Sequence, residues 1–214
     1  MKRMLSLLVF GLLASVAFAQ ENQAAEYEGL ERAYFAGGCF WCVEADFEKQ
    51  DGVVEVFSGY MGGDLENPTY KEVSTDTTGH REAVEVIYDP DVISYQELLS
   101  TFWRLHDPTD GEGSFVDRGF QYSSAIYVQD DEKRALAEGA VEALNAAGKF
   151  DAPIATEILD FSPFYLAEDY HQDYYQKSAT KYGFYRRLSG RDQFINGNWK
   201  GDDTVYQLET LVGN

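Results

Sequence analysis

Gly37-Gly38-Cys39-Phe40-Trp41-Cys42 is the stretch that decides the fold of this chain, and it holds the only two cysteines among 214 residues. It follows the apolar run 33–36, which is typical of a strand, and it opens a helical pattern marked by Val43 and Phe47. The sequence therefore predicts a strand, a glycine turn, and a helix whose first turn carries both sulfurs. The start of a helix exposes free N–H groups and the positive end of the helix dipole, which favour a thiolate over a thiol.

The spacing of Cys39 and Cys42 favours chemistry over structural support. A disulfide between them would close a very short loop, so it would constrain the unfolded chain little. Residues three apart on a helix are neighbours, and their sulfurs can be bridged with modest adjustment. We therefore interpret the pair as a redox or nucleophilic site. Cys39, nearer the dipole end, is expected to be the stronger thiolate.

The N-terminus has the composition of a secretory signal peptide. Lys2 and Arg3 precede the apolar run 4–16, and the small-x-small tripeptide 17–19 is typical of a cleavage site. The apolar run is shorter than the roughly 20 residues that a membrane-spanning helix needs. We expect residues 1–19 to be removed and the product to be secreted, into a bacterial periplasm, with no membrane association afterwards.

The remaining sequence predicts one acidic domain. Residues 20–30 form a polar lead segment, and residues 31–214 are long enough for a single catalytic domain with a C-terminal tail. The net charge of −20 argues against nucleic acid and anionic membrane surfaces as partners. Only three histidines are available to complete a zinc site, so we expect no metal. We expect the protein to be a monomer.

Strand and helix patterns alternate along the domain. Helices are expected over 39–50, 94–103 and 130–147, and further strands over 53–57, 82–88, 122–128 and 156–159. The glycine-rich segment 58–63 is expected to be irregular. The tail is expected to form one helix over 167–180, followed mostly by loop. The order predicts an α+β fold: a mixed sheet with packed helices and a β-α-β-β-α-β core, ferredoxin-like or split βαβ, plus an irregular C-terminal tail.

Three other classes of protein fit part of this pattern. A thioredoxin-like disulfide oxidoreductase also places Cys-x-x-Cys between a strand and a helix, and Pro153 before a strand could stand for its proline. Against it, two adjacent strands follow the first helix. A cysteine protease would pair Cys39 with His171, but the aromatic residues between the cysteines do not fit that class. The non-enzymatic alternative is an acidic, tyrosine-rich periplasmic binding protein.

A series of short motifs runs through residues 32–171 in a fixed order. They are Gly38-Cys39-Phe40-Trp41, Gly59-Tyr60, Asn67-Pro68-Thr69-Tyr70, Thr78-Gly79-His80, Glu82-Ala83-Val84, Tyr88-Asp89-Pro90, His106-Asp107-Pro108-Thr109, Gln121-Tyr122, Thr156-Glu157-Ile158 and Glu168-Asp169-Tyr170-His171-Gln172. Together they resemble the peptide methionine sulfoxide reductases of the A type, which act on the S epimer.

The resemblance implies the roles of four residues. Cys39 would attack the sulfoxide sulfur, release methionine and become a sulfenic acid. Glu82 would give its proton to the sulfoxide oxygen, and Tyr70 and Tyr122 would hydrogen-bond that oxygen. Such an acid must stay protonated near neutral pH, and a partly buried carboxyl beside aromatic rings can do so.

The resemblance also implies an aromatic surface that binds the apolar methyl group of the substrate. A sulfoxide is polar at its oxygen and apolar at its methyl group. Phe40 and Trp41 would hold the methyl group, and Asp117 would help to arrange the site. Many members of the family have a histidine where this chain has Arg118, so that edge of the pocket is expected to differ.

Recycling of the enzyme would fall to Cys42. Many members of the family carry recycling cysteines in a C-terminal tail, and this chain has no cysteine after Cys42. Cys42 would attack the sulfenic acid and form a disulfide with Cys39. The partners implied are oxidised proteins and a thioredoxin-like reductant, for which dithiothreitol can substitute, and no other cofactor is needed.

Overall fold

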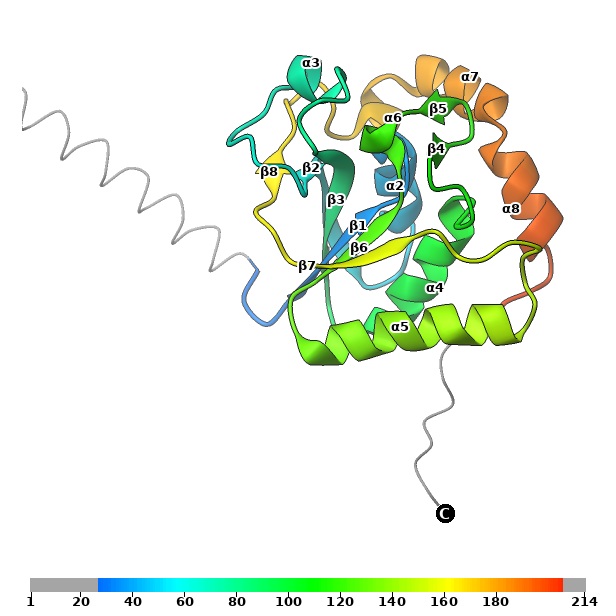
Figure 1. Ribbon diagram of the computed structural model, residues 1–214. Helices are drawn as coiled ribbons and strands as arrows, with labels where there is room; N and C mark the ends of the chain where they lie inside the picture. The colour runs from blue at the N-terminus through cyan, green and yellow to red at the C-terminus, as the bar shows by residue number, and fades with distance from the viewer. Residues whose placement is uncertain (1–26, 206–214) are drawn as a thin grey trace, which may run out of the picture. The chain divides into compact units, whose positions relative to one another are not determined.

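The computed structural model describes residues 27–205 (Figure 1). The chain divides into two units, 1–31 and 32–214, and the architecture below is that of the second. The predicted signal peptide, 1–19, lies outside the described residues, as does most of the polar lead segment 20–30. None of the helices within 27–205 combines the length and the apolar character that crossing a membrane requires.

A mixed sheet forms the centre of the fold. Within residues 27–205 it has six strands: β1 (Glu31–Ala36), β2 (Val53–Met61), β3 (Arg81–Tyr88), β6 (Ala125–Val128), β7 (Glu157–Asp160) and β8 (Tyr165–Leu166). Their order across the sheet is β7-β6-β1-β3-β2-β8. The β6–β7 pair is parallel, whereas β1–β6, β2–β3 and β2–β8 are antiparallel. Because β3 lies between β1 and β2, the sheet has the predicted split βαβ plan, and the fold class is confirmed.

Helices pack on this sheet. Three of the four predicted helices are α2 (Phe40–Phe47), α4 (Tyr95–Leu105) and α5 (Asp131–Ala146). The other elements are α3 (Tyr70–Val73), the hairpin β4 (Gly113–Ser114) and β5 (Asp117–Arg118), the 3₁₀ turn η1 (Phe120–Tyr122), α6 (Tyr174–Lys177), α7 (Ala179–Ser189) and α8 (Arg191–Trp199). The predicted capping box of Ser94 and Glu97 is present at the start of α4.

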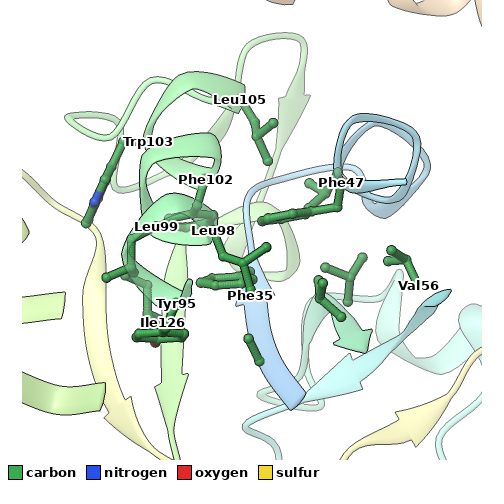
Figure 2. Close-up of a cluster of buried hydrophobic side chains, with 14 of the residues drawn as sticks. Phe35, Phe47, Val56, Tyr95, Leu98, Leu99, Phe102, Trp103, Leu105 and Ile126 are labelled. Carbon is green, nitrogen blue, oxygen red and sulfur yellow. The ribbon is translucent and has the colours of Figure 1, made fainter. Parts of the chain in front are cut away.

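The largest core cluster fixes α2 on the sheet (Figure 2). Phe35 of β1 stacks on Phe47 of α2 and on Phe102 of α4, with ring centroids 5.0 Å apart in both pairs. All three rings are fully buried. Since Phe35 and Phe47 flank the cysteine stretch on both sides, their packing fixes the position of the first turn of α2 relative to the sheet.

The strand β2 is longer than predicted. The segment 58–63 was expected to be irregular, but β2 continues through Gly59 to Met61. A side chain at position 59 would overlap the ring of Phe164 and the backbone of Tyr165 in β8. The glycine therefore marks the close approach of the neighbouring strand β8. This strand was not predicted from the sequence.

The segment before β6 and the tail also differ from expectation. Residues 120–122 form a 3₁₀ turn instead of extending the strand that was expected over 122–128. Helix α6 begins at Tyr174, whereas a helix was expected from 167, and the expected loop beyond 180 contains α7 and α8. These helices lack a strong apolar stripe. Helix α6 packs against α2, α8 packs against α4, and α7 contacts both α6 and α8 (Figure 1).

Candidate active site

The turn before α2 places Cys39 at the start of the helix. Gly38 has a φ of +88°, a conformation that glycine adopts without strain, and a side chain there would collide with Ser114. Cys39 is the N-cap of α2, and its carbonyl oxygen accepts hydrogen bonds from the N–H groups of Cys42 at 3.0 Å and Val43 at 3.3 Å. Cys42 therefore lies in the first turn of the helix, directly beside Cys39.

The two cysteines are free thiols whose acidities differ. Burial, the hydrogen bond with Cys42 and the negative charge of Glu82 raise the pKa of Cys39 well above its usual value. The hydrogen bond from Cys39, helped by the charges of Arg191 and Arg186, lowers the pKa of Cys42 to about 7. The two thiols share one hydrogen bond, and the charges of Arg191 and Arg186 act on Cys42. That Cys39 is the stronger thiolate stays a prediction.

Glu82 lies next to Cys39 although 43 positions separate them in the sequence. It is on β3, its side chain is 2% exposed, and its Oε2 accepts a hydrogen bond of 3.0 Å from the N–H of Phe40. That bond favours the carboxylate, but burial outweighs it and, with the charges of Asp117 and Cys42, raises the pKa of Glu82 to about 8. At neutral pH this carboxyl is mostly protonated, so it can donate a proton.

Two tyrosine hydroxyls lie near the same carboxyl. Tyr70 is the first residue of α3, whose start is fixed by the capping box of Thr69 and Glu72. Tyr122 ends the 3₁₀ turn η1. The two hydroxyls hydrogen-bond each other, and burial followed by the charge of Glu82 raises the pKa of both. Both are therefore neutral donors beside a protonated acid.

Aromatic rings form the other side of the site. Phe40 is buried, and its ring centroid lies 4.9 Å from that of His171 and 6.4 Å from that of Tyr70. Trp41 is half-buried and stacks on Tyr174, with ring centroids 3.9 Å apart. Its indole N–H donates to Nδ1 of His171 at 3.0 Å. Desolvation lowers the pKa of His171 to about 4, so this histidine is a neutral acceptor that fixes the indole.

Asp117 is joined to Cys39 through a residue that the sequence did not reveal. The hydroxyl of Tyr185 in α7 donates to Oδ2 of Asp117, and it also hydrogen-bonds Cys39. Nothing in the sequence around Tyr185 distinguishes it from the other tyrosines of the tail. Arg118, the neighbour of Asp117, is exposed, and its guanidinium donates to Oδ1 of Asp110 at 3.0 Å, so it does not contribute to this site.

The structure thus brings together all of the residues that the sequence predicted for the site. They are Cys39, Phe40, Trp41, Cys42, Tyr70, Glu82, Asp117 and Tyr122, with His171, Tyr174 and Tyr185 added. Within residues 27–205 there is no group of three or more His, Cys, Asp or Glu side chains that could hold a metal ion. A thiol pair, a buried acid and clustered hydroxyl donors beside an aromatic wall define a thiol-dependent oxidoreductase.

Comparison with known proteins identifies the family. Residues 31–203 match the family model of peptide methionine sulfoxide reductase. The chain is 54% identical over 172 residues to the peptide methionine sulfoxide reductase MsrA of Bacillus pumilus, covering 80% of this chain and 97% of that protein. It is 50% identical over 169 residues to the MsrA of Ligilactobacillus salivarius, covering 79% and 98%. The chain belongs to the peptide methionine sulfoxide reductase family and is an oxidoreductase that reduces methionine sulfoxide.

Solved structures agree with this assignment. Methionine sulfoxide reductase A of Corynebacterium diphtheriae superposes with a TM-score of 0.64 and 38% identity, covering 71% of this chain and 76% of that one. The reduced form of Mxr1 from Saccharomyces cerevisiae gives a TM-score of 0.65 and 33% identity, covering 71% and 87%. The family membership decides against the thioredoxin-like, protease and binding-protein alternatives.

Proposed function

We propose that this enzyme reduces the S epimer of methionine sulfoxide, free or within peptides and proteins, with Cys39 as the nucleophile. The observation that carries the proposal is the position of the buried, protonated Glu82, whose carboxyl is hydrogen-bonded to the N–H of Phe40, the residue after Cys39. Transfer of an oxygen atom from a sulfoxide requires a thiol that attacks the sulfur and a neighbouring acid that protonates the oxygen.

The reductase step moves the oxygen from the substrate to the enzyme. Cys39 gives up its proton and its sulfur forms a bond to the sulfoxide sulfur, while Glu82 supplies a proton to the sulfoxide oxygen. The oxygen, now a hydroxyl, then passes to the sulfur of Cys39: the bonds from the substrate sulfur to the oxygen and to Cys39 break, a bond between the oxygen and the Cys39 sulfur forms, and an electron pair stays on the methionine sulfur. The products are methionine, reduced by two electrons, and the sulfenic acid of Cys39, oxidised by two electrons. The hydroxyls of Tyr70 and Tyr122 donate hydrogen bonds to the oxygen as negative charge develops on it.

The substrate is oriented by the two unlike sides of the site. The methyl group lies against Phe40 and Trp41, and the oxygen points to the hydroxyl donors on Tyr70 and Tyr122. Because a sulfoxide sulfur is chiral, this arrangement accepts one epimer, and the choice of the S epimer rests on the resemblance to the A type. Asp117, fastened by Tyr185, lies at the edge of the site and helps to arrange it.

The recycling step uses Cys42. Its sulfur attacks the sulfenic sulfur of Cys39, water leaves with the oxygen, and a Cys39–Cys42 disulfide forms. The hydrogen bond between the two side chains and the lowered pKa of Cys42 support this role. A thioredoxin-like dithiol, or dithiothreitol in the test tube, then reduces the disulfide and restores both thiols.

The test is turnover of each epimer of a methionine sulfoxide peptide with dithiothreitol. The proposal expects methionine from the S epimer and none from the R epimer, and the Cys39→Ser variant is expected to be inactive. Turnover of the R epimer, or full activity of Cys39→Ser, would contradict it. Insulin-disulfide reduction by the same preparation without sulfoxide turnover would point instead to a disulfide oxidoreductase.

The proposal includes export of the enzyme. Residues 1–19 act as a signal peptide for secretion, with the periplasm of a bacterium as the destination, and residues 31–214 form the catalytic domain of a soluble monomer. The composition of residues 1–19, which lie outside the described residues, supports export. Fractionation of cells that express the tagged chain tests this, since export predicts a shortened form in the periplasmic fraction and a full-length cytoplasmic form would contradict it.

A further inference from the structure

Both cysteines are buried, with Cys39 5% and Cys42 0% exposed, and they differ in what surrounds them. Cys39 borders Glu82 and the hydroxyl of Tyr185 on the side of the substrate site. Cys42 lies in a buried cluster with Ala45 and Tyr182, and other aromatic residues pack around that cluster: Trp41, Tyr174, Tyr175 and Tyr185. A thiolate that reduces a disulfide must reach one of its sulfurs directly. With α6 and α7 in place, that sulfur is not Cys42.

The cover over Cys42 is fastened to the helix that carries the cysteines. Arg186 of α7 makes ion pairs of 2.8 Å with Asp46 of α2 and of 2.8 Å with Asp192 of α8. It also donates to the hydroxyl of Tyr182 at 3.0 Å. The guanidinium is mostly buried and joins three helices. The ring of Tyr182 is held over Cys42 by this hydrogen bond at its hydroxyl and by an edge-on contact with the ring of Tyr175.

A second cation lies behind the cysteine turn. Arg191, at the start of α8, is 1% exposed, and its guanidinium donates to the carbonyl oxygens of Gly37, at 3.3 and 3.4 Å, and of Leu105. It also lies over the ring of Phe115, with 5.1 Å from Cζ to the ring centroid. The guanidinium donates to uncharged carbonyls, and its positive charge acts on both Cys42 and Asp117. It therefore stabilises a thiolate on Cys42.

We propose that the reductant attacks Cys39 of the Cys39–Cys42 disulfide and that Cys42 departs as the thiolate; this inference rests on the recycling step of the proposed function. The reductant's thiolate forms a bond to the sulfur of Cys39, the Cys39–Cys42 bond breaks, and the electron pair stays on Cys42. A second thiol of the reductant then attacks its own sulfur in the mixed disulfide and releases Cys39. Position and charge agree: the sulfur on the substrate side is attacked, and the sulfur that leaves lies beneath Tyr182, where the charges of Arg191 and Arg186 act on it.

One consequence concerns the opening of the site. The reductant's sulfur reaches Cys39 from the same side as the sulfoxide, so the two reactants use one opening in turn. This opening can be used by a small thiol such as dithiothreitol and by a protein whose reactive thiol lies at a narrow protruding edge. The C-terminal helices need not open in either half of the cycle.

The experiment is to trap the mixed disulfide and locate it. The wild-type chain is oxidised with one equivalent of the sulfoxide peptide, and an intact mass lower than that of the reduced chain by two hydrogens first establishes the disulfide. It is then mixed with a thioredoxin whose second active-site cysteine is replaced by serine, quenched with acid and treated with N-ethylmaleimide. Chymotryptic cleavage between the cysteines and mass spectrometry identify the linked residue. We expect thioredoxin on Cys39 and N-ethylmaleimide on Cys42.

The possible outcomes are distinguishable. Thioredoxin linked to Cys42 at the earliest quench time would overturn the inference and leave the recycling disulfide intact. Absence of any Cys39–Cys42 disulfide would overturn the recycling step, and this inference with it. Tyr182→Ala removes the cover and is expected to make linkage to Cys42 detectable, whereas Phe184→Ala, an exposed neighbour on α7, is expected to leave linkage on Cys39 alone. An unchanged linkage in Tyr182→Ala would contradict the role given to the cover.

Discussion

Replacement of Glu82 by glutamine tests the acid that the reductase step requires. Glutamine keeps an oxygen to accept the hydrogen bond from the N–H of Phe40 but has no proton to give. General acid catalysis contributes about 10²–10⁴-fold to a rate, so methionine release is expected to slow by roughly that factor. Burial raises the pKa of Glu82 to about 8, and the useful form is the protonated one.

The pH dependence follows from that pKa. With a pKa of about 8, roughly nine tenths of Glu82 is protonated at pH 7 and roughly one tenth at pH 9. The acid's contribution is thus complete well below pH 8 and falls about tenfold between pH 7 and pH 9. Deprotonation of Cys39 raises the rate as the pH rises, whereas deprotonation of Glu82 lowers it. The decrease in rate at alkaline pH that is due to Glu82 is therefore the decrease that is absent in Glu82→Gln.

The assay is single-turnover methionine release without a reductant, measured from pH 5 to pH 10 for both proteins. Glu85→Gln is the matched control, because Glu85 is on the same strand but binds Tyr34 at 2.6 Å and Arg32 at 2.7 Å. We expect the control to keep the wild-type profile. Equal rates for Glu82→Gln and the wild type, or an alkaline fall that persists in Glu82→Gln, would refute the role of Glu82 as the acid.

Three further predictions concern Cys42, His171 and Glu44. The Cys42→Ser variant is expected to release about one methionine per chain and then to stall with a thioredoxin-type reductant, and normal recycling would show that Cys42 is not the resolving cysteine. His171→Phe frees the indole of Trp41 and is expected to raise KM more than it lowers kcat; an unchanged KM would mean that the hydrogen bond between them does not orient the substrate. Burial raises the pKa of Glu44 to about 8, so its ionisation costs stability as pH rises from about 4.5 to about 8. Glu44→Gln is therefore expected to stabilise the fold by on the order of a few kcal/mol at pH 9 but not at pH 4 in urea unfolding, and an equal effect at both pH values would contradict this.

Local signals in the sequence predicted the central fold. Ser94 and Glu97 form the capping box that their spacing indicated, and the apolar period after them is the buried face of α4. The prediction of an irregular segment around Gly59 was wrong, because the sequence does not distinguish a glycine required for the close approach of β8 from one required for a turn. The prediction for the tail was wrong as well, because its helices depend on contacts with α2, with α4 and with one another more than on their own pattern.

The site was predictable where a motif marked it and not where only the fold brings residues together. Cys39 and Glu82 could be found from motifs. Tyr185 could not, because its partner Asp117 is 68 positions away and no local pattern joins them. The lowered pKa of Cys42 depends first on the hydrogen bond from Cys39, which the motif places, and then on the charges of Arg191 and Arg186. The two arginines lie about 150 positions further along the chain in helices that the sequence did not predict.

The most direct test of the central claim is to count products and thiols in one turnover of the fully reduced wild-type enzyme. The chain is mixed with excess S-epimer peptide and no reductant, and methionine and free thiols are measured together. We expect about one methionine per chain with the loss of both thiols, and no methionine from the R epimer. Release of methionine with both thiols retained, or no release at all, would contradict it.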